Sequence, residues 1–203
     1  MTEQGVTEQG VTEQEVKTAG SSARRSTILA VIVVFSALIA VGTILSIPLP
    51  PPLYELTWSP AIYMALALMV DQWTAASATG MGSFIGEAFN VAYKGGGSPI
   101  YPFGMIWARA PEALIIGWAR TKSQKMVVLA MVGATVFETL AFFFPDWLFY
   151  NYALFQYQPQ GGIWPSFATA SYDFGTLADL AYIPVALLLA KAAKPAFRRL
   201  GFG

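Results

Sequence analysis

The sequence predicts an all-α membrane protein, a six-transmembrane-helix bundle whose N-terminus and C-terminus are both cytoplasmic. Of its 203 residues, 55% are hydrophobic and only 12% are charged, and the mean hydropathy is +0.51. That composition is too apolar for an ordinary soluble domain. Apolar stretches near the 20 or so residues needed to cross the hydrocarbon core recur along the chain. The sequence is therefore expected to be a multi-pass protein of the cell (plasma) membrane.

The apolar stretches predict one membrane domain, residues 26–199. Its helices are expected at about 26–46, 58–70, 73–93, 101–121, 125–144 and 174–194. The second helix is short, because Asp71 and Gln72 interrupt the apolar run. Residues 1–25 contain TEQGV twice and TEQEV once, a polar repeat with little apolar surface to bury. We expect them to form a disordered cytoplasmic tail.

Basic residues set the orientation of the bundle, since cytoplasmic flanks hold the excess of Lys and Arg. With the N-terminus inside, ten of the twelve fall on the cytoplasmic side: Lys17, Arg24, Arg25, Arg120, Lys122, Lys125, Lys191, Lys194, Arg198 and Arg199. Only Lys94 falls outside, and Arg109 lies within a span. The net charge is zero and no face is basic, so no nucleic-acid partner is expected.

The chain has no cysteine and no histidine. Thiolate nucleophiles, histidine catalysis and imidazole or thiolate metal sites are therefore excluded. We expect no metal and no cofactor.

Five ionisable residues lie inside the predicted spans: Glu87, Arg109, Glu112, Glu138 and Asp179. Each costs about 3 kcal/mol to insert, so each is a candidate functional residue. At 1.5 Å per residue, Arg109 lies roughly 12 Å from the outer end of its helix, and the others also fall in the outer half. Arg109 and Glu112 are three residues apart and can pair directly. The remaining acids have no obvious cationic partner, which predicts a polar cavity that opens outward.

Two long connections lie above this predicted cavity, residues 46–60 and 145–173. The first is rich in proline and ends near Trp58. The second holds the aromatic residues Trp147, Tyr150, Tyr152, Tyr157, Trp164 and Tyr172, with Asn151, Gln156, Gln158 and Gln160 between them. A single ring in this position is as readily explained by the aromatic belt at the membrane surface. The loop as a whole favours a lid that stacks on a flat ligand.

Small residues on the first helix have two explanations. Ser36 and Ala40 are four residues apart, and Ala37 lies beside them. This spacing allows close packing against another helix of the same chain, or against a separate membrane subunit.

Two segments carry a resemblance to a known family. PAIYMALALMVDQWTAASATGMGSFIGE and ARAPEALIIGW resemble the second to fourth helices of the substrate-binding S components of energy-coupling factor (ECF-type) vitamin transporters. The likeness covers about residues 26–199. The family's Ala-xxx-Ala docking face is replaced by Ser36-xxx-Ala40, and its Gly-Pro turn by Asp71-Gln72-Trp73.

The resemblance implies high-affinity binding and import of a small water-soluble, vitamin-like nutrient. It also implies partners in the lipid bilayer: a membrane coupling subunit, which would dock at Ser36, Ala37 and Ala40, and two ATPase subunits. By analogy, the ligand contacts would come from Trp58, Glu87, Asn90, Arg109, Glu112, Glu138, Trp147, Tyr150, Asn151, Trp164, Tyr172 and Asp179. Aromatic rings with excess acid suit thiamine or its pyrimidine precursor, although rings would also stack on a flavin, a pterin or a queuosine precursor.

Three other classes of function are possible. An ion-coupled secondary carrier of a small organic solute would use one of the buried acids for the coupling ion, although the chain shows no internal repeat. An intramembrane enzyme would need a catalytic signature, and none is recognisable. A scaffold without a ligand would leave five charges within the membrane unexplained. Glu138→Gln is expected to abolish ligand affinity without affecting expression, and a folding defect would instead mark Glu138 as structural.

Overall fold

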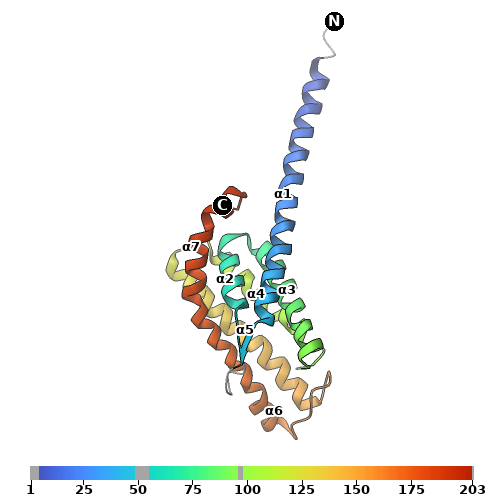
Figure 1. Ribbon diagram of the computed structural model, residues 1–203, viewed down its shortest axis with the longest axis vertical. Helices are drawn as coiled ribbons and strands as arrows, with labels where there is room; N and C mark the ends of the chain where they lie inside the picture. The colour runs from blue at the N-terminus through green and yellow to red at the C-terminus, as the bar shows by residue number, and fades with distance from the viewer. Residues whose placement is uncertain (1–4, 49–54, 96–97, 203) are drawn as a thin grey trace.

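A computed structural model describes residues 5–48, 55–95 and 98–202, and the chain is built almost wholly from helices (Figure 1). The helices are α1 (Gly5–Ile44), α2 (Ser59–Met69), α3 (Gln72–Phe89), α4 (Tyr101–Ala119), α5 (Gln124–Tyr152), α6 (Ile163–Ala170) and α7 (Ile183–Arg199). A π-helical turn, η1 (Asn90–Lys94), extends α3, and a 3-10 helix, η2 (Ser171–Tyr182), joins α6 to α7. The helical fold class is thus confirmed.

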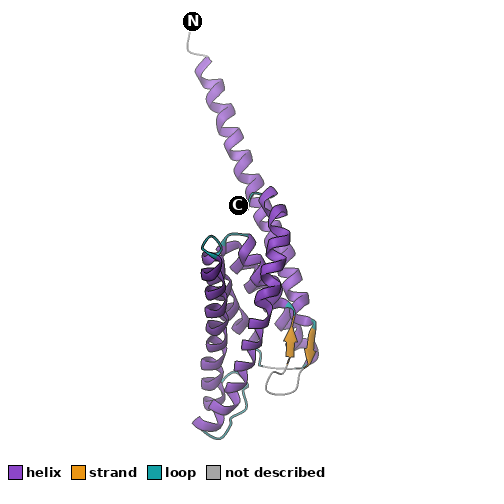
Figure 2. Cartoon of the chain, turned by 90° about the vertical axis from the view of Figure 1, so that its left-hand side faces the viewer, coloured by secondary structure: helices purple, strands orange, loops and turns teal. Residues whose placement is uncertain are grey.

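A small hairpin connects α1 to α2. Strands β1 (Ser46–Pro48) and β2 (Glu55–Thr57) are antiparallel, with Ser46 opposite Thr57 (Figure 2). The prolines Pro50, Pro51 and Pro52 of this proline-rich connection lie outside the described residues.

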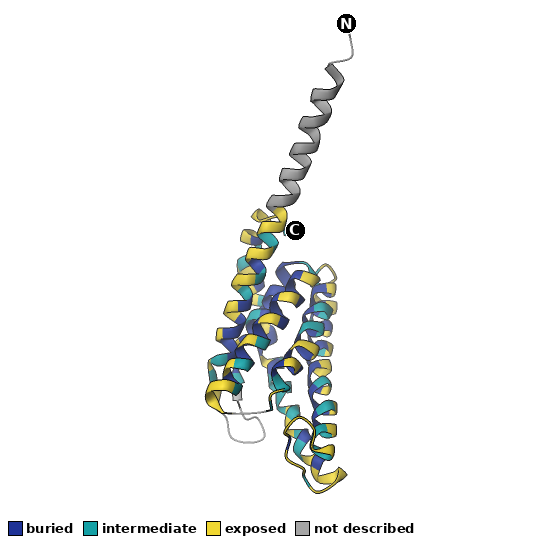
Figure 3. Ribbon diagram, turned by 90° about the vertical axis from the view of Figure 1, so that its right-hand side faces the viewer, coloured by how far each residue is buried: buried dark blue, intermediate teal, exposed yellow. Residues whose placement is uncertain are grey.

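Within the described residues, three helical segments are long and apolar enough to cross a membrane. They are Arg24–Ile44, Gln124–Tyr152 and the continuous helical path Ile163–Arg199. Large apolar side chains on their outward faces are exposed, for example Leu29, Leu129 and Leu188 at more than 60% (Figure 3). Such surfaces suit lipid rather than water. The chain is therefore a helical protein with the surface expected of membrane association.

The short helix α2 forms the centre of the bundle. Ten of its eleven residues are buried, and it contacts α1, α3, α4 and α7. Pro60 occupies its first turn, where the missing amide breaks no helical hydrogen bond. Tyr63 and Met64 have no exposed surface. Four helices of the bundle are therefore packed on a helix only about 16 Å long.

Helices α1 and α3 approach closely at glycine. A Cβ atom at Gly82 would lie 2.6 Å from the carbonyl oxygen of Ser36, and one at Gly86 would lie 2.8 Å from that of Ala40. The Ser36 hydroxyl also donates to the carbonyl of Ala78 at 3.2 Å. Ser36 and Ala40, two of the three predicted docking residues, are thus covered by α3, while Ala37 is exposed.

The helix limits differ from the expected ones in three places, of which one is the end of the expected 145–173 loop, where α6 and the start of η2 are helical. Residues 5–25, expected to be a disordered tail, continue α1, which projects beyond the other helices (Figure 1). Extending a formed helix avoids the costly nucleation step. Helix α5 passes through Pro145 and ends at Tyr152, so the first part of the expected 145–173 loop is helical. A proline within a helix is tolerated where neighbouring groups satisfy the freed carbonyl.

Candidate functional site

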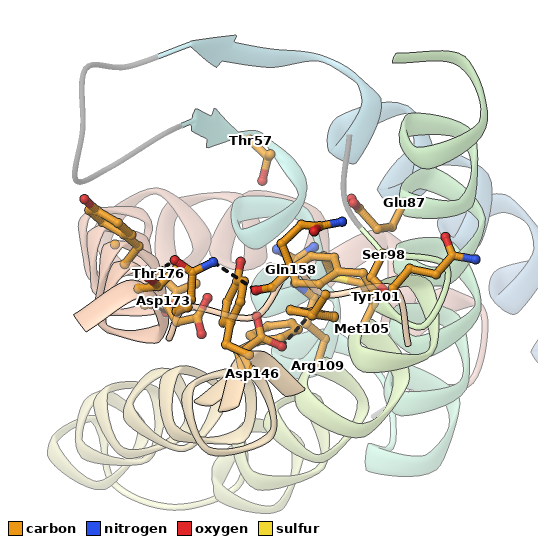
Figure 4. A pocket seen from close by; sticks show the side chains of 18 of the residues that line it. Thr57, Glu87, Ser98, Tyr101, Met105, Arg109, Asp146, Gln158, Asp173 and Thr176 are labelled. Carbon is orange, nitrogen blue, oxygen red and sulfur yellow. Dashed lines mark hydrogen bonds between the residues drawn. The ribbon is translucent and has the colours of Figure 1, made fainter. Parts of the chain in front are cut away.

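A cavity of about 590 Å³ lies at the end of the bundle where α4 begins and α5 ends (Figure 4). Its size is in the usual range for sites that hold a small organic molecule. The wall is formed by Thr57, Glu87, Ser98, Tyr101, Met105, Arg109, Phe142, Asp146, Tyr150, Gln156, Tyr157, Gln158, Gln160, Thr169, Tyr172, Asp173, Gly175, Thr176 and Asp179. Four carboxylates thus face one guanidinium group across the cavity.

One wall is a row of polar side chains on η2. A 3-10 helix has three residues per turn, so side chains at positions i and i+3 eclipse one another. Asp173, Thr176 and Asp179 follow this spacing, and all three line the cavity. We call these three residues the η2 row. Their Cα atoms span about 12 Å at the 3-10 rise, so the row extends along the depth of the cavity.

The two acids of the η2 row have carboxylate oxygens without partners. Asp179 is only 8% exposed and makes no hydrogen bond or ion pair with any residue that the structure describes. The Oδ2 atom of Asp173 is buried and has no hydrogen-bond partner among those residues. Between them, the Thr176 hydroxyl lies 2.7 Å from the Thr139 hydroxyl of α5. A buried carboxylate without donors is costly, so this wall is incomplete without a further group.

The segment between α5 and α6 covers the cavity from one side. The Tyr157 hydroxyl donates to Asp146 Oδ1 at 2.8 Å, and the Tyr157 ring packs edge-on against that of Tyr150. Burial and the adjacent Asp146 carboxylate raise the pKa of Tyr157, so its phenol keeps the donated proton. Gln156, Gln158 and Gln160 come from the same segment. The Gln160 amide donates to the Gln158 carbonyl and accepts from the Thr169 hydroxyl, so Gln156 and Gln158 supply the other amide groups of this wall.

A second polar cluster lies at and below the inner end of the cavity. It comprises Ser59, Tyr63, Arg109, Glu112, Thr135 and Glu138, and we call it the core network. Arg109 Nε donates to Glu138 Oε1 at 2.8 Å, and its Nη1 donates to Ser59 Oγ at 3.2 Å. The Arg109 and Glu138 side chains are 7% and 0% exposed. The other oxygen, Glu138 Oε2, has no partner among the described residues.

Glu112 belongs to the core network but does not pair with Arg109. The Tyr63 hydroxyl donates to Glu112 Oε2 at 2.6 Å, and the Thr135 hydroxyl donates to Oε1 at 3.2 Å. The expected Arg109–Glu112 pair is therefore wrong, as is the expectation that Glu138 has no cationic partner. A spacing of three residues along α4 allows Arg109 to reach Glu112. The packing of α5 against α4, however, places Glu138 Oε1 2.8 Å from Arg109 Nε.

The predicted ligand contacts separate into two groups. Five line the cavity: Glu87, Arg109, Tyr150, Tyr172 and Asp179. The other seven are Trp58, Asn90, Glu112, Glu138, Trp147, Asn151 and Trp164, and none of them lines it.

The seven residues outside the wall have identifiable settings. Glu112 and Glu138 are in the core network. Asn90 is buried, with its side-chain amide 3.3 Å from Glu87 Oε2. Trp147 packs on Phe143 and Phe167. The rings of Trp58 and Trp164 are 49% and 77% exposed, and Asn151 is partly exposed.

Several wall residues were not among the predicted ligand contacts. Asp146 and Tyr157 lie in the stretch expected to be a loop, and Tyr101 and Met105 occupy the first turns of α4. Asp173 and Thr176 could have been found from their spacing of three to Asp179, had η2 been recognised as a 3-10 helix. Within the described residues, no group of three or more acidic side chains is placed to hold a metal ion.

The fold and the cavity together define a helical protein with helices long and apolar enough to span a membrane and an acid-lined polar cavity at one end of its bundle. No protein-family model matches the chain, and neither a curated protein nor a solved structure is significantly similar to it. Inference about its function therefore depends on the chain's own residues.

Proposed function

We propose that the chain is the substrate-specific S component of an ECF-type transporter. In this proposal it crosses the plasma membrane six times with both ends cytoplasmic, binds a vitamin-like nutrient on the outer side and is not itself an enzyme. A membrane coupling subunit and two ATPase subunits would drive delivery inward. Thiamine and its pyrimidine precursor are the first candidate nutrients.

The cavity is the observation that carries this proposal. It combines a volume of about 590 Å³ with aromatic rings, amides and carboxylates, the mixture that orients a small water-soluble molecule. A scaffold without a ligand would have no use for Asp179, a buried acid that lines the cavity without a hydrogen-bonding partner among the described residues.

The position of the cavity supports an outward-facing site. Ser98, Tyr101 and Met105 place it at the start of α4, whereas Arg120 and Lys122 follow the other end of that helix. Lys194, Arg198 and Arg199 lie near the end of α7, which is the end far from η2. If the basic end is cytoplasmic, the cavity opens to the outside.

Mass spectrometry of whatever co-purifies with the protein tests the proposal. The full chain is purified in detergent, denatured, and the released small molecules are identified. We expect a vitamin-like heterocycle in near-stoichiometric amount, or binding of one member of a vitamin panel to the emptied protein. A protein that yields no small molecule and binds none of the panel would contradict the proposal.

Uptake measurements separate an ECF subunit from an ion-coupled carrier. Cells that express the chain are compared with and without an ECF coupling module, using the radiolabelled nutrient identified above. Uptake that requires the module and ATP is the expected result. Uptake by the chain alone that collapses with the proton or sodium gradient would establish the carrier instead.

A further inference from the structure

The charges around the cavity point to the kind of molecule that it holds. Glu87, Asp146, Asp173 and Asp179 line it, whereas Arg109 is the one cationic group among the described residues of its wall. Arg109 is already bound through Nε and Nη1 to Glu138 and Ser59. The guanidinium charge is thereby largely balanced within the protein, and the acids set the electrostatic potential of the cavity.

We propose that the cavity selects a flat organic cation and that the η2 row holds its positive charge. The inference rests on the proposed function only in taking the cavity as the ligand site. Asp179 forms the inner contact, Asp173 the outer contact, and the Thr176 hydroxyl lies between them. An anionic nutrient is rejected, because it would meet carboxylates in a medium where like charges repel strongly.

The carboxylate oxygens of Asp179 and Asp173 that lack hydrogen-bond partners indicate where the positive charge is held. Asp179 is more than nine-tenths buried, lines the cavity and has no donor among the described residues. Asp173 Oδ2 is likewise buried without a partner in the described part of the chain. Desolvated carboxylates are stable when an opposite charge with N–H donors or a diffuse cationic ring faces them. A bound cation would interact with the carboxylates of both Asp173 and Asp179.

The opposite walls suit a flat ring rather than a compact ammonium ion. Tyr101 and Phe142 stack on each other with ring centres 5.5 Å apart and planes 18° apart, and both line the cavity. Tyr150 and Tyr157 meet edge-on at 4.7 Å. Aromatic faces attract cations and stack on planar heterocycles. Shape and charge therefore favour the same class of ligand.

Two sets of matched probes test the charge requirement. Thiamine, a fixed cation, is compared with its pyrimidine precursor, which is largely uncharged at mildly alkaline pH. The second set keeps one ring and changes only charge: 1-methylnicotinamide is cationic, nicotinamide is neutral and nicotinate is anionic. Binding to the emptied full chain in lipid nanodiscs is measured by calorimetry.

The expected order follows charge within each set. Thiamine binds at least ten-fold more tightly than its precursor, 1-methylnicotinamide more tightly than nicotinamide, and nicotinate does not bind. Failure of both cations to bind, or neutral or anionic probes that bind as tightly as the cations, would overturn the inference.

Variants of the η2 row test the assignment of residues. Asp179→Asn and Asp173→Asn are each expected to weaken thiamine binding at least ten-fold, while Asp71→Asn serves as the matched control. Asp71 is an acid of the α2–α3 turn that does not line the cavity. Monodispersity and thermal unfolding verify that each variant is folded, and Asp173→Asn decides the question if Asp179→Asn does not fold. Unchanged affinity in the folded row variants would overturn the assignment.

The outcome is separable from that of the proposed function. Cation binding without transport by an ECF module would overturn the S-component proposal and leave this inference intact. Import of a tightly bound neutral or anionic vitamin by an ECF module would support the S-component proposal and overturn the inference that the cavity selects a cation.

Discussion

The core network and the η2 row are neighbours, and both bury carboxylates within apolar helices. In the core network, Glu138 receives a charged donor from Arg109, and Glu112 receives two hydroxyl donors. In the η2 row, Asp179 receives none from the described residues. Under the proposed function, this difference separates acids that hold helices together from acids that bind the ligand. Neutralising substitutions should therefore have opposite effects on stability in the two clusters.

The largest effect is expected for the ion pair between α4 and α5. Arg109→Gln or Glu138→Gln alone leaves a buried charge without its partner, which costs about 3–5 kcal/mol in known cases. The double substitution removes both charges and should recover most of that loss. The free energy of unfolding is measured by SDS titration in mixed micelles for all four proteins of the cycle.

This prediction revises the role of Glu138. The sequence led us to expect that Glu138→Gln would lose ligand affinity while folding normally, whereas the ion pair with Arg109 favours a structural role for the residue. Single variants as stable as the parent, with ligand affinity lost, would restore the original interpretation and break the comparison between the two clusters.

The next effect concerns a hydroxyl donor of the core network. Tyr63→Phe removes the 2.6 Å hydrogen bond to Glu112 and should cost about 1–3 kcal/mol, because the carboxylate stays buried with one donor fewer. Tyr182→Phe is the matched control, since the Tyr182 hydroxyl is buried without a partner among the described residues. Its removal is expected to be neutral or slightly stabilising in the same unfolding assay. Equal losses for the two variants would show that the hydrogen bond is not the cause.

The opposite sign is expected for the η2 row. In the ligand-free protein, Asp179→Asn removes a buried carboxyl group that receives no donor from the described residues, and it should raise the free energy of unfolding by about 1 kcal/mol. Thermal unfolding of emptied protein, with Asp71→Asn beside it, checks this expectation. A clear loss of stability in Asp179→Asn would place Asp179 with the core network and remove the distinction.

The sequence predicted the parts of this arrangement that depend on composition and depth. Helices followed from apolar length, and a polar cavity in the outer half followed from the positions of Glu87, Arg109 and Asp179 along their helices. These quantities are local, so a single chain contains them. The cavity wall does hold all three residues.

The sequence could not predict that residues 171–182 form a 3-10 helix, nor which helices far apart in the sequence pack against each other. Asp173 and Asp179 fall on different faces of an α-helix, and only the three-residue period of η2 brings them into one row. Similarly, the i, i+3 spacing permits Arg109 to reach Glu112, but the position of α5 decides that it binds Glu138 instead. Choices among possible partners depend on tertiary packing.

Asp71 offers a third setting for an acid and the smallest expected effect. It begins α3, where one carboxylate oxygen accepts from the Thr74 amide at 3.0 Å and the other from the Thr74 hydroxyl at 2.6 Å. Partial burial acts to raise the pKa of Asp71, but these hydrogen bonds, with a contribution from Arg120, lower it below its ordinary value. Asp71→Ala removes the helix cap and should cost about 1 kcal/mol, whereas Asp71→Asn retains it.

The sign of the pH dependence follows from that lowered pKa. The ionised carboxylate is favoured more in the folded than in the unfolded protein, so its contribution is complete above the unfolded-state pKa. It disappears as the pH falls through the lower, folded-state value. The stability difference between the parent and Asp71→Ala should therefore shrink in thermal unfolding experiments at progressively lower pH. A difference that grows on acidification would mean that Asp71 is held as the neutral acid and not as an ionised helix cap.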